Sequence, residues 1–137
     1  RVRSPLFNAI MYDPGGMSRA EREVGALAAS MVNHCIYCAA VHADRHAKLE
    51  NSTELTDSLF AKGAKADLSL RDRAIFDFAQ GLSAAPSKAS KENVKALRAA
   101  GLQEVEILDL ILSTALFGWA NRLMHVLGDP VRQEDES

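Results

Sequence analysis

The sequence of 137 residues has little cysteine, proline or aromatic content, with two cysteines, four prolines and 6% aromatic residues. Two cysteines three positions apart are not the disulfide framework of a secreted mini-domain. In a chain long enough to bury a core they indicate a cytoplasmic redox or metal-binding pair. Basic residues are not in excess, with 16 against 18 acidic ones, so neither nucleic-acid binding nor a polybasic membrane anchor is predicted. The longest apolar stretch, residues 107–120, is interrupted by Asp109 and Gly118 and is too short to suggest a membrane span.

What the sequence does contain is helical periodicity along most of its length. Ser18 with Glu21, Ser69 with Asp72, and Ser90 each precede an apolar pattern of helical period, which marks the start of a helix. We predict an all-α fold with helices over about 4–12, 18–32, 35–49, 53–62, 69–82, 90–100 and 103–127, followed by an acidic tail. The chain begins with arginine rather than methionine, so we expect residues 1–137 to be a single domain that has been trimmed at its N-terminus.

The stretch from residue 33 to residue 46 holds both cysteines and three of the four histidines. On a helix, Cys35, Cys38, His42 and His46 share one face, spread over roughly 80° of arc. The spacing of three lets the two thiols close a disulfide, and His42, one turn after Cys38, can take or return its proton. The free N–H groups of a first helical turn would favour Cys35 as the thiolate. The pattern predicts a redox site and leaves open which cysteine attacks.

Zinc is the main alternative for these residues. A tetrahedral site needs ligands about 2.0–2.3 Å from one point, whereas Cys35 and His46 are separated by about 16 Å along a helix axis. We therefore predict no metal, and expect His46 to lie on the helix surface or in a subunit contact. Tyr37 is expected to fill the core or to lie near a thiol. We expect Trp119 to be a core residue.

Two features suggest association between copies of the chain. The helix before the cysteines has a face of small residues, Gly25, Ala28 and Ala29, which another helix can approach closely. The last predicted helix is apolar over more of its circumference than a monomer needs. A homo-oligomer is therefore expected.

One more residue completes a recognisable pattern. Glu23 precedes Cys35 by twelve positions, and Glu23, Cys35, Cys38 and His42 together resemble the AhpD-like alkylhydroperoxidase family of the carboxymuconolactone decarboxylase superfamily. The family pattern is Glu, eleven residues, CxxC, three residues, His, and the chain fits every position. Supporting similarity lies in residues 70–74, 96–102 and 121–122, so that the resemblance extends from about residue 7 to residue 128.

The resemblance implies an oligomeric AhpD-like helical bundle, often a trimer or a trimer of dimers (a hexamer). It implies reduction of a hydroperoxide substrate, regeneration by a thiol or dithiol electron donor, and no metal or organic cofactor. By position, Cys35 and Cys38 would be the redox pair, and Glu23 and His42 the proton relay. The chain departs from the best-known members at Tyr37, where they carry a second histidine. Independently of the resemblance, a tight turn at Asn33 would fold Glu23 back towards His42.

Two other functions compete with this interpretation. A lactone decarboxylase of the parent superfamily would use Glu23 or His42 as acid or base, although such a protein has no need of the two cysteines. A non-enzymatic, redox-sensing oligomer would use the disulfide to change its assembly.

Overall fold

The computed structural model describes residues 2–128, which contain helices and no strand. The helices are α1 (Arg3–Tyr12), α2 (Arg19–Val32), α3 (Ile36–Glu50), α4 (Glu54–Lys62), the short 3₁₀ helix η1 (Gly63–Lys65), α5 (Leu70–Ser83), α6 (Lys91–Ala99) and α7 (Glu104–Leu127). The prediction of an all-α fold is confirmed for this part of the chain. The predicted acidic tail lies outside the described residues.

The helix starts agree with the sequence because they are set by local contacts. Ser18 Oγ accepts a hydrogen bond from the backbone N–H of Glu21, and Ser69 Oγ accepts one from that of Asp72, at 3.2 and 3.1 Å. Ser90 caps α6 in the same way. Each bond satisfies an N–H group that the first turn of a helix leaves without a partner.

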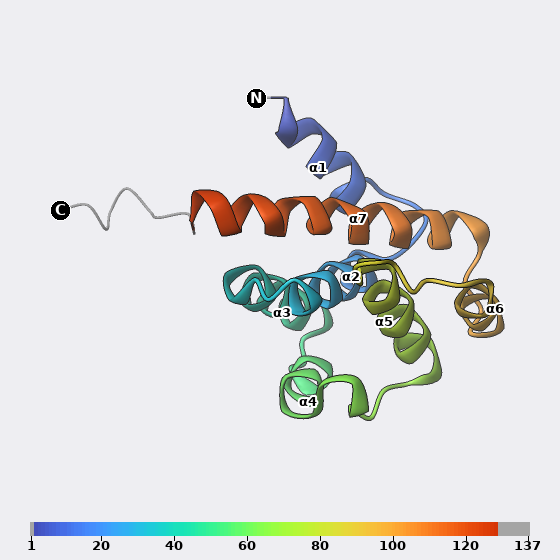
Figure 1. The fold of residues 1–137 in the computed structure, drawn as a ribbon. Helices are drawn as coiled ribbons and strands as arrows, with labels where there is room; N and C mark the ends of the chain where they lie inside the picture. The colour runs from blue at the N-terminus through green and yellow to red at the C-terminus, as the bar shows by residue number, and fades with distance from the viewer. Residues whose placement is uncertain (1, 129–137) are drawn as a thin grey trace.

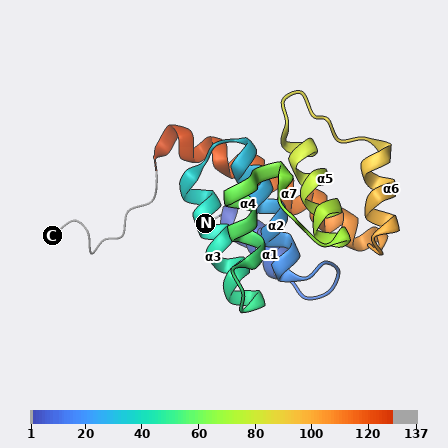
Figure 2. The ribbon, with the colours of Figure 1, turned by 90° about the horizontal axis from the view of Figure 1, so that it is seen from below.

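Helix α2 is the central element of the fold and packs against α3, α5 and α7. In Figure 1, α7 runs across the molecule above α2, α3 and α5, and α1 lies on the other side of α7. Figure 2 shows α3 and α4 on one side of α2, and α5 and α6 on the opposite side. The residues of α2 that contact α3 and α7 therefore lie in the interior.

The small residues of α2 allow it to lie between other helices. The prediction that their face forms a contact between copies of the chain was wrong. A Cβ atom added at Gly25 would lie 3.0 Å from both Leu110 Cδ1 and Thr114 Oγ1 of α7. Ala28 and Ala29 are fully buried within the chain. The small-residue face is thus occupied by helices of the same chain and is not available to a second subunit.

Arg22 fixes the connection between α1 and α2. Its guanidinium is buried and donates to the carbonyl oxygens of Met17, Ile10 and Gly15 at 2.9, 3.0 and 2.6 Å. Nη2 also lies 3.5 Å from a carboxylate oxygen of Asp109 on α7. These contacts tie the end of α1 and the loop after it to the first turns of α2 and α7.

Arg71 joins α5 to two other helices. It donates to the carboxylates of Glu21 on α2 and Glu106 on α7, with shortest N···O distances of 2.5 and 2.7 Å. Burial raises the pKa of Glu106, but the backbone N–H of Gln103 and the Arg71 guanidinium outweigh it, so that this pKa lies below its ordinary value.

Helix α7 is apolar on two sides. By length and composition alone it could cross a membrane, and 44% of its most apolar window is buried inside the protein. On the outer side Val105, Leu108, Leu112 and Trp119 are exposed. Trp119 is 44% exposed and is not the core residue that the sequence suggested.

Candidate active site

The turn between α2 and α3 places the first cysteine. The N–H of His34 donates to Met31 O and that of Cys35 to Ser30 O, at 3.2 and 3.0 Å. This pair of bonds is a Schellman motif, which needs a left-handed residue after the helix. That residue is His34, with a φ of 55°, instead of the usual glycine. The motif ties the backbone of Cys35 to the end of α2.

The two cysteines lie at the N-terminus of α3, in positions slightly different from those predicted. Cys35 is the N-cap, with its carbonyl accepting from the N–H of Ala39, and Asn33 is the C-cap of α2. Cys38 is the residue that falls within the first turn. Both side chains are buried, and their sulfur atoms lie 2.6 Å apart, close enough to form a disulfide with little movement.

Glu23 and His42 form the second part of the site. A carboxylate oxygen of Glu23, on α2, lies 2.5 Å from Nδ1 of His42, on α3, as the tight turn predicted. Both residues are 1% exposed. Phe117 of α7 packs against the imidazole edge to face, with ring centroids 4.0 Å apart. The ring is therefore fixed through Nδ1 and through its contact with Phe117, and Nε2 is the nitrogen left for proton exchange.

Cys38 and His42 share a pocket of about 290 Å³ that is formed by α1, α3 and α7. Phe7 and Met11 of α1, together with Phe117 and Met124 of α7, form an apolar wall. Tyr37, which is 39% exposed, lines the same pocket and does not fill the core. A small apolar molecule in this pocket would meet the Cys38 side of the cysteine pair next to the imidazole.

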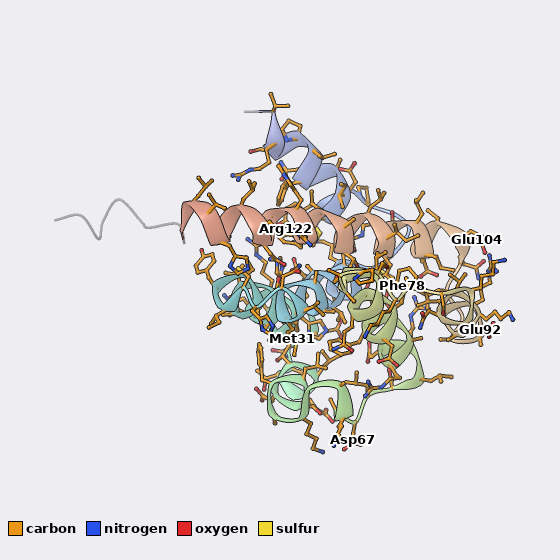
Figure 3. All side chains as sticks on the ribbon, in the orientation of Figure 1. Met31, Asp67, Phe78, Glu92, Glu104 and Arg122 are labelled. Carbon is orange, nitrogen blue, oxygen red and sulfur yellow. The ribbon has the colours of Figure 1, made fainter. Side chains whose placement is uncertain are left out.

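Cys35 faces a different pocket. This second pocket, of about 430 Å³, lies between α2, α3 and α4 and is lined by Cys35, Met31, Ile36 and Phe60 among others. Met31 is seen between the layer of α2 and α3 and helix α4 in Figure 3. Cys35 also lines a smaller pocket of about 210 Å³ with Met124 and His125. The cysteine pair can therefore be approached from more than one side, with the imidazole on the Cys38 side.

A buried polar network behind the turn was not recognised as part of the site from the sequence. Asn121 of α7 is fully buried, donates to Ser30 Oγ at 3.1 Å, and accepts from the side chain of Asn33 at 3.2 Å. His125 Nε2 lies 2.7 Å from Asn33 O. The available signal was a polar residue on the apolar face of the last helix, where a buried amide needs partners.

His46 does not belong to the group around Cys38. It is buried, in contrast to the surface position expected, and its Nδ1 atom has no hydrogen-bond partner among the described residues. It lines a separate pocket of about 410 Å³ near Ser18 and Glu21. Within residues 2–128 no group of three potential ligand residues could hold a metal ion.

Comparison with known proteins agrees with the architecture. A model of the carboxymuconolactone decarboxylase family matches residues 1–54, which include Glu23 and the cysteine-bearing segment. The chain is similar to the alkylhydroperoxidase AhpD core of an uncharacterized peroxidase-related protein from Ralstonia eutropha JMP134. That match has 30% identity and a TM-score of 0.83, and covers 95% of this chain and 68% of that one. The comparison with curated proteins found no match.

Two further crystal structures share the fold. An uncharacterized peroxidase-related protein from Silicibacter sp. TM1040 is 26% identical, with a TM-score of 0.83 over 96% of this chain and 69% of that one. A protein of unknown function from Agrobacterium tumefaciens is 19% identical, with a TM-score of 0.78 over 93% and 88% of the two chains. The helical fold is thus that of peroxidase-related proteins. The chain belongs to the AhpD-like family of the carboxymuconolactone decarboxylase superfamily.

Proposed function

We propose that the protein is a thiol-dependent peroxidase of AhpD type, reducing hydroperoxides through Cys35 and Cys38. The observation that carries the proposal is the buried contact between Glu23 and His42, with His42 lining the same pocket as Cys38. The sulfur of Cys35, 2.6 Å from that of Cys38, supplies the resolving thiol. The function needs no metal or organic cofactor, because the dithiol itself provides the two electrons.

In the proposed reaction, His42 takes the proton of Cys38 through Nε2 while Glu23 holds Nδ1. The Cys38 thiolate attacks the outer peroxide oxygen, and the O–O bond breaks. The alkoxide leaves as the alcohol after receiving the proton from His42, and Cys38 becomes a sulfenic acid. The Cys35 thiol then attacks that sulfur and gives up its proton. The S–O bond breaks, the hydroxyl leaves with that proton as water, and the disulfide forms. A thiol or dithiol donor returns the pair to the reduced form by disulfide exchange.

This function is tested by a single turnover of the fully reduced protein with one equivalent of cumene hydroperoxide in the absence of a donor. We expect one equivalent of the alcohol, the loss of two thiols per chain, and no covalent dimer on a non-reducing gel. Protein alkylated at both cysteines before mixing is the control. Two intact thiols and unconsumed hydroperoxide would refute the assignment.

The family match also supports a second candidate, a lactone decarboxylase, because the matching model is that of the carboxymuconolactone decarboxylase family. Such an enzyme would use Glu23 or His42 as acid or base and would not need the thiols. A double Cys35→Ser and Cys38→Ser variant that decarboxylates a carboxymuconolactone as fast as the unmodified protein would favour this function.

We also propose that the protein is a homo-oligomer, a trimer or a hexamer, in the cytoplasm, where thiol donors are reduced. The exposed Val105, Leu108, Leu112 and Trp119 on the outer side of α7 support association, since burying them would remove a long apolar surface from water. Light scattering at micromolar concentration should give a mass several times that of one chain. A monomer mass would contradict this.

A further inference from the structure

The pocket beside Cys38 has a distinctive charge. Two of its lining residues are arginines, Arg3 and Arg45, and none is aspartate or glutamate. The pocket near His46 has the opposite character, with five carboxylates in its lining: Glu21, Glu50, Glu54, Asp67 and Asp72. The chain has almost equal numbers of acidic and basic residues, so this separation is local to the two pockets. An anion is favoured in the first of them.

Arg45 is placed to act on a molecule that reaches the thiol. It follows Cys38 by seven residues on α3, which is two turns along the same helix face and about 10 Å along the axis. Side chains on a helix lean towards its N-terminus, and Arg45 lines the same pocket as His42 and Cys38. Among the described residues Arg45 has no hydrogen bond or ion pair, whereas Lys48 on the same helix is paired with Asp44. Its guanidinium is therefore available to a ligand.

The second arginine and the rest of the lining define the remaining parts of the ligand. Arg3 lies over the ring of Phe7, with its guanidinium carbon 5.6 Å from the ring centroid, at the α1 side of the pocket. The rest of the lining includes the apolar side chains of Met11 and Phe117, together with polar side chains such as those of Ser4 and Asn8. A volume of about 290 Å³ is at the small end of ligand pockets, and suits one aromatic ring better than a long chain.

We propose that this pocket selects organic hydroperoxides with a ring-sized apolar body and a carboxylate on the side away from the peroxide group. The inference rests on the proposed peroxidase function and specifies its substrate class. Arg45 is the specificity-determining residue. It binds the carboxylate by charge-assisted hydrogen bonds, and the apolar body then directs the peroxide oxygen towards the sulfur of Cys38. Arg45 takes no part in the transfer of electrons or protons.

A binding experiment tests the selectivity without depending on turnover. The probes are 4-(2-hydroxypropan-2-yl)benzoate, which is the alcohol expected from the matching hydroperoxide, and its neutral methyl ester. Their dissociation constants are measured with the reduced protein by calorimetry or by NMR titration. We expect the acid to bind about tenfold more tightly than the ester, and this ratio to fall as ionic strength rises.

Variants locate the charge responsible. In Arg45→Gln the affinity for the acid should be only about one- to twofold that for the ester. Arg45→Lys should retain part of the preference, because the positive charge is kept while the planar guanidinium is lost. Arg122→Gln is the matched control. Arg122, labelled in Figure 3, lies on α7 outside the pocket lining and donates to Gly118 O of its own helix, so the ratio should stay at its original value.

Three results would overturn the inference: equal binding of acid and ester to the unmodified protein, no saturable binding of either, or a preference that Arg45→Gln leaves unchanged. The single turnover with neutral cumene hydroperoxide is independent of these measurements. If two thiols are lost but the acid is not preferred, the peroxidase function is supported and the proposed substrate class is refuted. If the acid is preferred but the thiols stay intact, the peroxidase function is refuted and the pocket is an anion-binding site only.

Discussion

We expect Cys38→Ser to lower the rate of hydroperoxide reduction by roughly a thousandfold or more, as when a catalytic nucleophile is removed. Cys35→Ser protein should still reduce a single equivalent and then stop, because the sulfenic acid formed on Cys38 has no resolving thiol. Rapid mixing with cumene hydroperoxide, followed by quantification of the alcohol, measures both variants. Thermal unfolding of each variant provides the control for folding.

The reverse result would assign the attack to Cys35. The sequence left this question open, since proximity to a helix N-terminus favoured Cys35 and proximity to His42 favoured Cys38. In the structure Cys35 is the N-cap and faces the pocket next to α4, whereas Cys38 shares its pocket with His42. If Cys38→Ser reduces one equivalent while Cys35→Ser is inert, the substrate binds in one of the two pockets that Cys35 lines.

Glu23→Gln is expected to lower the reactivity of the thiols at neutral pH by roughly 100- to 10,000-fold, the usual contribution of general acid–base catalysis. The amide keeps the shape of the carboxylate and can accept a hydrogen bond from Nδ1, but it cannot balance the charge of a protonated imidazole. Thermal stability should therefore change little. The measurement is the rate of alkylation as a function of pH for the unmodified protein, Glu23→Gln and His42→Ala.

Glu21→Gln is the matched control for this experiment. Glu21 lies on the same helix two residues earlier and is paired with Arg71, away from the thiols. Its substitution should leave the alkylation profile unchanged. If Glu23→Gln also reproduces the original profile while His42→Ala does not, the proton relay ends at the histidine, and Glu23 has only a structural role.

The parts of the structure that follow from neighbouring residues could be predicted from the sequence. The start of α5 depends on Ser69 and Asp72 alone, and the common face of Cys38 and His42 depends only on helical period. The contact between Glu23 and His42 joins two helices, but a single short turn connects them. That turn leaves few ways for the second helix to return along the first.

The remaining features depend on long-range packing and leave no local pattern. Asn121 meets Ser30 across 91 positions, and α1 supplies Phe7 and Met11 to a pocket whose thiol lies on α3. The small residues of α2 predicted a close helix contact correctly, but the sequence could not show that the partner was α7 of the same chain. His46 was misplaced for a similar reason, because its burial depends on elements beyond its own helix.

The most direct measurement of the central claim is the oxidation product of Cys38 in the Cys35→Ser variant. The reduced variant is mixed with one equivalent of cumene hydroperoxide in the presence of dimedone, which traps sulfenic acids, and the peptide containing Cys38 is analysed by mass spectrometry. The proposed mechanism predicts one dimedone adduct on Cys38 for each molecule of alcohol formed. It also predicts a much slower reaction in the double variant that carries both Cys35→Ser and Glu23→Gln. An unmodified Cys38 thiol after exposure to the hydroperoxide would contradict it.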